Sequence, residues 1–169
     1  MSISMYAASV PVLNQMLDSM SDVLSKAEAH ATAKNIAPEA YLQARLFPDM
    51  FPLVRQVQIG ADFAKGIAGR LAQVDLPSYE DNEQTFAELQ ARIAKTKAFI
   101  ATLDAAKFEG SEGRDVVLRP GTPKEKTFSG TAYLFSYGLP QFFFHVTTTY
   151  AILRHNGVDL GKKDFMGAI

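Results

Sequence analysis

The chain has 169 residues and a formal net charge of −1, so its length suits one domain that buries roughly two thirds of its unfolded surface. Acidic and basic residues nearly balance and no run of Lys or Arg occurs, which argues against a nucleic-acid partner. The sequence has no cysteine, which excludes disulfides, thiolate nucleophiles and Cys-ligated zinc.

The N-terminal stretch does not have the pattern of a targeting signal. It reads MSISMYAASVPVLNQMLDSM, lacks a basic leader and carries polar residues inside its apolar pattern. No window approaches an uninterrupted apolar span of about 20 residues, which a membrane-crossing helix requires. We therefore expect a soluble, cytoplasmic protein with a single domain over residues 1–169 and no membrane contact.

Apolar residues that alternate three and four positions apart predict a first long helix. The polar residues between them are typical of a solvated side. Pro11 lies inside this helix and removes one backbone hydrogen bond, but the pattern continues on both sides of it. The apolar positions are Ile3, Tyr6, Val10, Leu13, Leu17, Met20, Leu24 and Ala27.

The pattern breaks at NIAPE, residues 35–39, where Pro38 is well placed for the first turn of a new helix. A short helical piece over residues 39–46 leads to Pro48, and a second long helix follows. Its small residues would let a neighbouring helix approach closely. Its apolar stripe consists of Met50, Val54, Val57, Ala61, Ala64, Ala68 and Leu71.

A polar edge beside this second stripe contains Gln58, Asp62 and Lys65. At 100° per residue, Gln58 lies about 80° from the centre of the stripe, whereas Gln56 lies on the far side. This geometry favours Gln58 as the amide that points inward. Asp49 is a further candidate at the start of the helix, where a carboxylate also interacts favourably with the helix dipole.

The connector DLPSYEDN, residues 75–82, precedes a third helix that Asp81 or Asn82 can cap. Glu88 and Arg92 have the spacing of an exposed i,i+4 pair, which adds only a few tenths of a kcal/mol. We expect no chemistry from this helix. Its inward face consists of Phe86, Leu89, Ile93, Thr96, Ile100 and Leu103.

Residues 107–128 differ in kind from the helices, because they contain GSEGRDVVLRPGTPKEKTF with three glycines and two prolines. The β-branched pair Val116 and Val117 and the turn signal PGTP predict an irregular loop or a small hairpin. A connection of this length inside a compact domain often has a role of its own, such as a lid or a contact surface. A plain crossover loop is the alternative.

Ser129 is a candidate N-cap for the last helix, which Gly157 ends. Gly138 and Pro140 lie inside it and predict a kink or an interruption. The stretch LPQFFFHVTTTYAILRHNG follows, and in it Gln141, His145, Thr148, Thr149 and Ile152 share one face. The bulky phenylalanines around this face turn it toward a core, where each polar side chain needs a partner.

Four amphipathic helices predict an all-α four-helix bundle, whose ligand sites form between facing helices. The inward polar face of the last helix should therefore meet Gln58 or Asp62 of the second. His145 could be a metal ligand, a general acid or base, or a core histidine hydrogen-bonded to Gln141, Gln58 or a threonine. No nucleophile elbow and no phosphate-binding glycine loop occur.

Two long stretches carry a resemblance to a known family. RLFPDMFPLVRQVQIGADFAK in the second helix and LPQFFFHVTTTYAILRHNGVDLGKKDF at the C-terminus resemble an uncharacterised branch of the DinB/YfiT-like superfamily, and the resemblance covers nearly the whole chain. It implies an up-down-down-up bundle that is usually a homodimer. In better-known members, one histidine of helix two and an HxxxH pair of helix four bind a divalent metal, and some members are thiol-dependent transferases or hydrolase-like enzymes.

Aligned on Arg154 and Gly157, His145 matches the second histidine of the HxxxH pair, and Gln141 takes the place of the first. The second helix contains no histidine, and Gln58 lies in that neighbourhood, with Gln56 and Asp49 as alternatives. Amide oxygens are weaker ligands than imidazole for zinc, nickel or iron, so we expect divalent metal binding to be weak or absent.

Two functions follow as hypotheses. The first is an atypical member of the metal-dependent enzyme group that binds a small molecule or a weak metal in a polar cleft. The second is a non-catalytic dimeric interaction protein, whose polar core residues only set the helix register. The residues expected to form the cleft are Gln58, Asp62, Gln141, His145 and Thr149.

Overall fold

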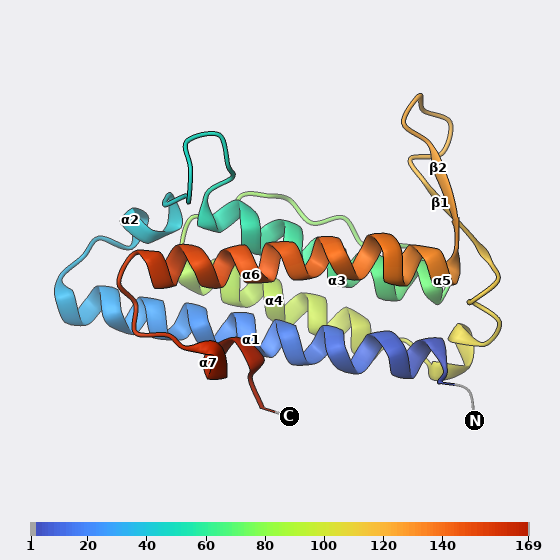
Figure 1. Cartoon of the computed structure of the whole chain (residues 1–169), viewed down its shortest axis with the longest axis horizontal. Helices are drawn as coiled ribbons and strands as arrows, with labels where there is room; N and C mark the ends of the chain where they lie inside the picture. The colour runs from blue at the N-terminus through green and yellow to red at the C-terminus, as the bar shows by residue number, and fades with distance from the viewer. Residues whose placement is uncertain (1–2, 169) are drawn as a thin grey trace.

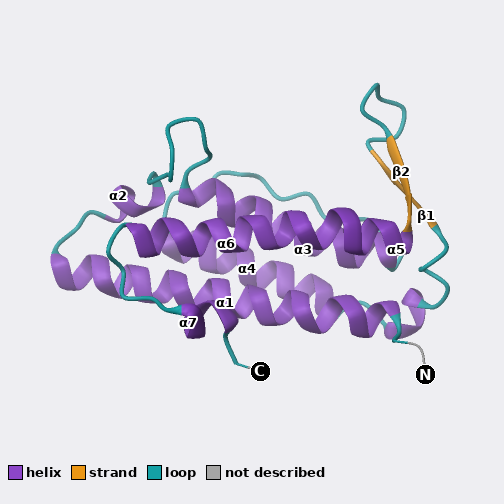
Figure 2. Ribbon diagram, in the orientation of Figure 1, coloured by secondary structure: helices purple, strands orange, loops and turns teal. Residues whose placement is uncertain are grey.

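The computed structural model describes residues 3–168, so residues 1, 2 and 169 of the predicted domain lie outside the described residues. Four long helices extend along the molecule (Figure 1, Figure 2). They are α1 (Met5–Lys34), α3 (Leu53–Leu71), α4 (Phe86–Ala101) and α6 (Leu139–His155). The shorter elements are α2 (Pro38–Leu42), η1 (Ala105–Phe108), β1 (Asp115–Leu118), β2 (Lys126–Ser129), α5 (Gly130–Ala132), η2 (Tyr133–Gly138) and α7 (Lys162–Met166).

The long helices do not simply alternate in direction. α1 and α6 run one way along the bundle, and α3 and α4 run the other way, as the colour gradient shows (Figure 1). The connector over residues 72–85 returns the chain along the bundle before α4 begins. As a result α3 packs against α6 on one side and α4 on another. No helix within residues 3–168 has both the length and the apolar character needed to cross a membrane.

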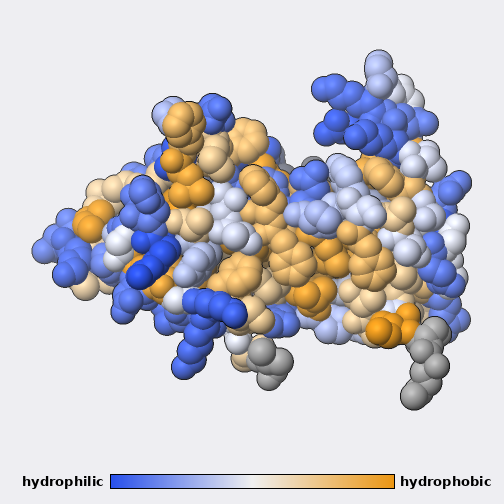
Figure 3. Space-filling model, viewed as in Figure 1, coloured by the Kyte–Doolittle hydropathy of each residue, from blue (hydrophilic) through white to orange (hydrophobic). Residues whose placement is uncertain are grey.

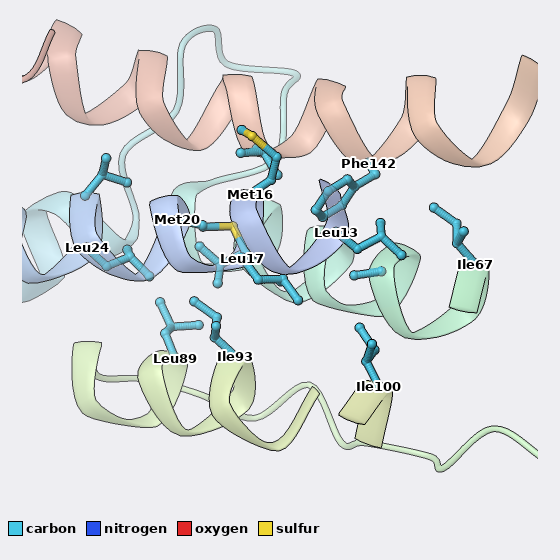
Figure 4. Close-up of a cluster of buried hydrophobic side chains, with 14 of the residues drawn as sticks. Leu13, Met16, Leu17, Met20, Leu24, Ile67, Leu89, Ile93, Ile100 and Phe142 are labelled. Carbon is cyan, nitrogen blue, oxygen red and sulfur yellow. The ribbon is translucent and has the colours of Figure 1, made fainter. Parts of the chain in front are cut away.

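Most of the predicted apolar stripes meet in one hydrophobic core, but Ile3 is 80% exposed and precedes α1, and Met50 precedes α3 and lies outside the core. Leu17 and Met20 of α1 point toward Leu89 and Ile93 of α4, while Phe142 of α6 enters the core from the opposite side (Figure 4). All five side chains are buried. Each such burial stabilises the fold by roughly 1.5–3 kcal/mol relative to exposure, so the stripes hold the four helices together.

The start of α4 differs from the predicted cap. Thr85, not Asp81 or Asn82, is the N-cap: its hydroxyl accepts from the Glu88 backbone N–H at 3.1 Å, and the Glu88 carboxylate accepts from the Thr85 N–H at 3.0 Å. This capping box occupies Glu88. The predicted exposed pair of Glu88 with Arg92 is therefore wrong, and Arg92 is instead fully buried.

The predicted interruption near Pro140 is a widened turn rather than a break. Residues Tyr133–Gly138 form a single π-helical stretch, and α6 continues directly from it. Pro140 has no N–H to donate, and a local π-turn accommodates such a missing bond without ending a helix. Gly138 lets this turn approach α3 closely, because a Cβ there would lie 2.8 Å from Cγ1 of Ile67.

Residues 107–128 contain the small hairpin that the sequence allowed. β1 and β2 pair antiparallel, with Val116 opposite Phe128 and Leu118 opposite Lys126. The hairpin projects from one end of the bundle (Figure 1). Arg119, directly after β1, adopts a φ of 53°, a left-handed conformation that is uncommon for a residue other than glycine.

Candidate functional site

His145 of α6 and Gln56 of α3 form a buried polar pair. Nδ1 of His145 lies 2.7 Å from Oε1 of Gln56, and the two residues are 7% and 1% exposed. The Gln56 amide nitrogen donates to the Phe51 carbonyl at 3.1 Å, which turns the amide oxygen toward the histidine. Nδ1 of His145 must therefore carry the proton, and Nε2 has the free lone pair.

The preference for Gln58 as the partner of His145 is wrong. Gln58 is also buried, at 4% exposure, but its amide nitrogen donates to Oε2 of Glu83 at 2.9 Å and its oxygen accepts from Arg55 at 3.1 Å. The two glutamines lie on different sides of α3, and the sequence predicts that only one of these sides is covered. Both amides point inward, because α6 covers one side of α3 and the connector that carries Glu83 covers another.

The other predicted residues also divide between two places. Thr149 is fully buried and donates to the carbonyl of His145 at 2.9 Å, within its own helix. Gln141 lies one turn before His145 and is half-buried. Asp62 contacts Lys65 at 2.8 Å and Arg92 at 3.0 Å. The structure thus does not bring all five into one cleft, and their role in binding stays a prediction.

The environment of His145 keeps its imidazole neutral. Burial, with a smaller effect of the positive charge on Arg55, lowers the pKa of His145 to about 4. Phe63 stacks on the ring at a centroid distance of 5.8 Å, and Phe144 meets it edge-on at 5.2 Å. A histidine with this pKa is a weak base near neutral pH and is suited to structural hydrogen bonding.

A buried ion cluster lies on the side of α3 that faces α4. The Arg92 guanidinium is fully buried and reaches Asp62 at 3.0 Å, Asp81 at 2.9 Å and Glu83 at 3.2 Å. Arg55 also pairs with Asp81. These contacts join α3, α4 and the connector between them. Because each charge in the cluster already has a partner, we assign it a structural role.

A cavity of about 210 Å³ opens beside the His145 pair, between α3, η2 and the end of β1. Phe63 forms the wall between the two sites, since its ring stacks on His145 and lies 6.1 Å from that of Tyr137. The cavity thus adjoins the predicted polar centre without containing His145. Its lining consists of Asp62, Phe63, Arg70, Leu118, Arg119, Tyr133 and Tyr137.

Arg70 is held at the cavity by its own helix and by η2. Its guanidinium donates to the Tyr133 hydroxyl at 3.1 Å. It lies over Gly66, one turn earlier in α3, where a Cβ would come within 2.3 Å of Nη1. Tyr133 and Tyr137 stack with centroids 6.1 Å apart. Burial raises the pKa of Tyr133, so its hydroxyl stays protonated near neutral pH.

Comparison with known proteins agrees with this architecture. A family model described as "Domain of unknown function (DUF1993)" matches residues 5–166. The chain belongs to the DUF1993 family.

A solved structure is similar to this DUF1993 protein along most of its length. It is described as the crystal structure of a DinB family member protein from Shewanella denitrificans, and it aligns with a TM-score of 0.91 and 36% sequence identity. The similarity covers 97% of this chain and 92% of that chain, which confirms the predicted DinB-like, all-α fold. No curated protein matches the sequence.

The residues present in this DUF1993 protein do not fit the divalent metal that the DinB resemblance implies. His145 offers one imidazole nitrogen, and the residues around it, Gln56 and Gln141, offer amides. Within residues 3–168, no three His, Cys, Asp or Glu side chains lie together as a metal site. A structural or catalytic zinc needs at least three strong protein ligands, so we derive no reaction step through a metal.

The cavity residues of the DUF1993 protein were only partly visible in the sequence. Tyr133 with Tyr137, and Gly66 with Arg70, are spaced four apart and must share a helix face. The spacing does not show that the pair on α3 and the pair on η2 come together at one cavity. The sequence contains no indication that Arg119 lines a cavity, beyond its position in the glycine-rich and proline-rich segment.

Proposed function

We propose that this DUF1993 protein is a cytoplasmic small-molecule-binding member of the DinB-like group that does not depend on a resident metal. The observation that carries the proposal is the cavity of about 210 Å³ lined by arginine and tyrosine side chains. A concave site with apolar walls and a few convergent polar groups is the usual form of a ligand site. The absence of cysteine from the chain is in keeping with the proposed cytoplasmic location.

The neighbouring histidine supports this choice of site. Nδ1 of His145 and the Gln56 amide are engaged with one another, and Gln58 is engaged by Glu83 and Arg55. Groups that already have partners in the interior gain little from a ligand that must first displace those partners. The His145 pair therefore supports the wall of the cavity and sets the register between α3 and α6.

A fragment screen followed by amide NMR tests the proposal. Fragments are expected to shift the resonances of residues 62–70 and 133–137. Leu118→Trp, which fills the cavity from the end of β1, should abolish these shifts. Val117→Trp is the matched control, because neighbouring residues of a strand point to opposite faces and Val117 is 41% exposed. Fragment binding that survives Leu118→Trp, or no binding in this region, would contradict the proposal.

Homodimerisation is a second candidate activity, favoured by exposed aromatic side chains. Phe47 and Phe51 lie on the loop between α2 and α3 and are 62% and 55% exposed, and Phe144 of α6 is 54% exposed. The loop projects from the bundle, and its apolar surface is visible in Figure 3. Such groups are typical of a contact with a second copy of the chain.

Light scattering after size exclusion tests the dimer. The wild type should have about twice the monomer mass, and Phe47→Ser with Phe51→Ser should be monomeric. Phe135→Ser, which removes a comparably exposed aromatic side chain from η2, should leave the dimer intact. A monomeric wild type would exclude this candidate.

A further inference from the structure

We infer that the cavity takes a small organic anion, with its negative group between Arg70 and Arg119 and its flat apolar body against Phe63 and Tyr137. This inference rests on the proposed small-molecule function and specifies the chemical class of the ligand. It uses residues outside the His145 pair.

The charges that line the cavity leave positive potential available to a ligand. Among the residues that the structure describes, no carboxylate lies within ion-pair distance of Arg70 or Arg119. Asp62, the one acidic lining residue, already contacts Lys65 and Arg92. Two cations without counterions beside a compensated carboxylate favour an anion over a cation or a neutral ligand.

Arg70 is pre-positioned to hold such an anion. Gly66 leaves the space that its guanidinium occupies, although glycine inside a helix is less favourable than alanine. The Tyr133 hydroxyl, on a side chain only 1% exposed, fixes the same guanidinium at one nitrogen. A guanidinium has five N–H donors, so others remain for a carboxylate or phosphate.

Arg119 comes to the cavity from the hairpin. Its left-handed backbone, with a φ of 53°, begins the hairpin turn, in which its carbonyl accepts from the Thr122 N–H at 3.3 Å, and its side chain is exposed to solvent. A second hollow of about 370 Å³ shares Leu118, Arg119 and Tyr137 with the cavity. It adds Lys124 and Lys126 to the lining, and its single carboxylate, Glu125, is bound to the Gly121 N–H at 2.6 Å. Positive charge therefore also lines the hollow next to the cavity.

The dimensions and walls of the cavity limit the rest of the ligand. At roughly 30 Å³ per water, a volume of about 210 Å³ corresponds to about seven waters. This is below the roughly 300–1,000 Å³ of sites for drug-sized ligands. The Phe63 and Tyr137 rings are inclined at 59° and present aromatic surface. One ring-sized body with a single carboxylate or phosphate group matches this space.

The test uses the full chain and four probes: benzoate, phenyl phosphate, the neutral isostere benzamide, and inorganic phosphate. Isothermal titration and amide NMR are expected to show benzoate or phenyl phosphate binding at millimolar concentrations or below, with shifts at residues 66–70 and 133–137. Benzamide should bind at least about tenfold more weakly, because it lacks the charge. Inorganic phosphate should also bind more weakly, because it lacks the ring.

Substitutions then locate the anion. Arg70→Gln and Arg119→Gln should each weaken binding about tenfold or more, as expected for a hydrogen bond to a charged group. Gly66→Ala should weaken it similarly by displacing the guanidinium, with the helical circular-dichroism signal retained. Arg154→Gln is the control, because it removes an equal charge at the far end of α6 and should leave the affinity unchanged.

The outcomes separate the two proposals. If benzamide binds as tightly as benzoate, or the Arg70 and Arg119 variants retain wild-type affinity, the anion inference is overturned while cavity binding stands. The anion inference is also overturned if other fragments bind in the cavity but benzoate and phenyl phosphate do not. Inorganic phosphate binding as tightly as phenyl phosphate overturns the role given to Phe63 and Tyr137. If nothing binds in the cavity, both proposals fail.

Discussion

Nδ1 of His145 donates a 2.7 Å hydrogen bond to Oε1 of Gln56 and so joins α6 to α3 in the interior of the bundle. Gln56 is oriented in turn by the Phe51 carbonyl, so a chain of hydrogen bonds runs from the loop before α3 to the middle of α6. In this geometry the pair has the properties of a structural contact.

Removing one member of the pair should destabilise the protein. Gln56→Leu leaves the buried Nδ1–H of His145 without an acceptor, which costs about 1–3 kcal/mol of unfolding free energy in urea titrations. The double variant Gln56→Leu, His145→Leu should lose less than the sum of the two single losses, because it leaves no unpaired polar group. Strict additivity would show that the bond contributes nothing.

Stability should fall as the pH drops through the range set by His145. The histidine has a pKa of about 4 in the folded protein and an ordinary value near 6.5 in the unfolded chain, so the unfolded state takes up the proton first. The contribution of neutral His145 to the free energy of unfolding is complete above about pH 6.5. It is lost progressively toward pH 4, and the total loss is about 3 kcal/mol.

The measurement is the difference in unfolding free energy between the wild type and His145→Gln at several pH values. The variant lacks the titrating imidazole, so its stability should depend less on pH in this window. Parallel curves for the two proteins would show that His145 titrates normally in the folded state.

Arg92 should be far more sensitive to substitution than a surface arginine. Arg92→Met leaves the carboxylate of Glu83, whose side chain is 5% exposed, without its positively charged partner, which should cost about 3–5 kcal/mol. Adding Glu83→Gln should recover part of the loss. Lys97→Met, which breaks the exposed pair with Asp18, should cost less than about 1 kcal/mol and serves as the control in the same urea titrations.

Metal binding should require imidazoles that the chain lacks. Elemental analysis of tag-free protein is expected to find zinc, nickel and iron below one equivalent, since one histidine with amides is a poor ligand set. Gln56→His with Gln141→His places two more imidazoles around His145 and should tighten zinc binding at least about tenfold.

Gln58→His with Gln141→His is the matched control for that design. It adds the same number of histidines, but position 58 faces Glu83 rather than His145. Equal zinc affinity for the two double variants would contradict the assignment of Gln56 as the neighbour of His145. One equivalent of zinc, nickel or iron in the wild type would show that His145 and the amides around it do form a metal site.

Much of the fold was predictable from the sequence, because helix formation depends on local spacing. The stripe from Leu13 to Leu24 predicted α1 and its buried side, and the helix passes through Pro11 as expected. Ser129 begins the last helical run and Gly157, with a φ of 89°, follows its end, as their residue types predict. Burial of His145 also followed from the phenylalanines around it.

Only the tertiary structure decided which polar groups meet. A helical wheel gives the direction of a side chain about its own axis, but not which neighbouring helix covers that direction. Gln56, expected on the far side of α3, is buried against His145 of α6, and Gln58, expected to meet His145, is buried against Glu83 of the connector. Arg92 was buried by residues of the preceding connector. The cavity formed where α3, η2 and a hairpin distant in sequence come together, which no local pattern records.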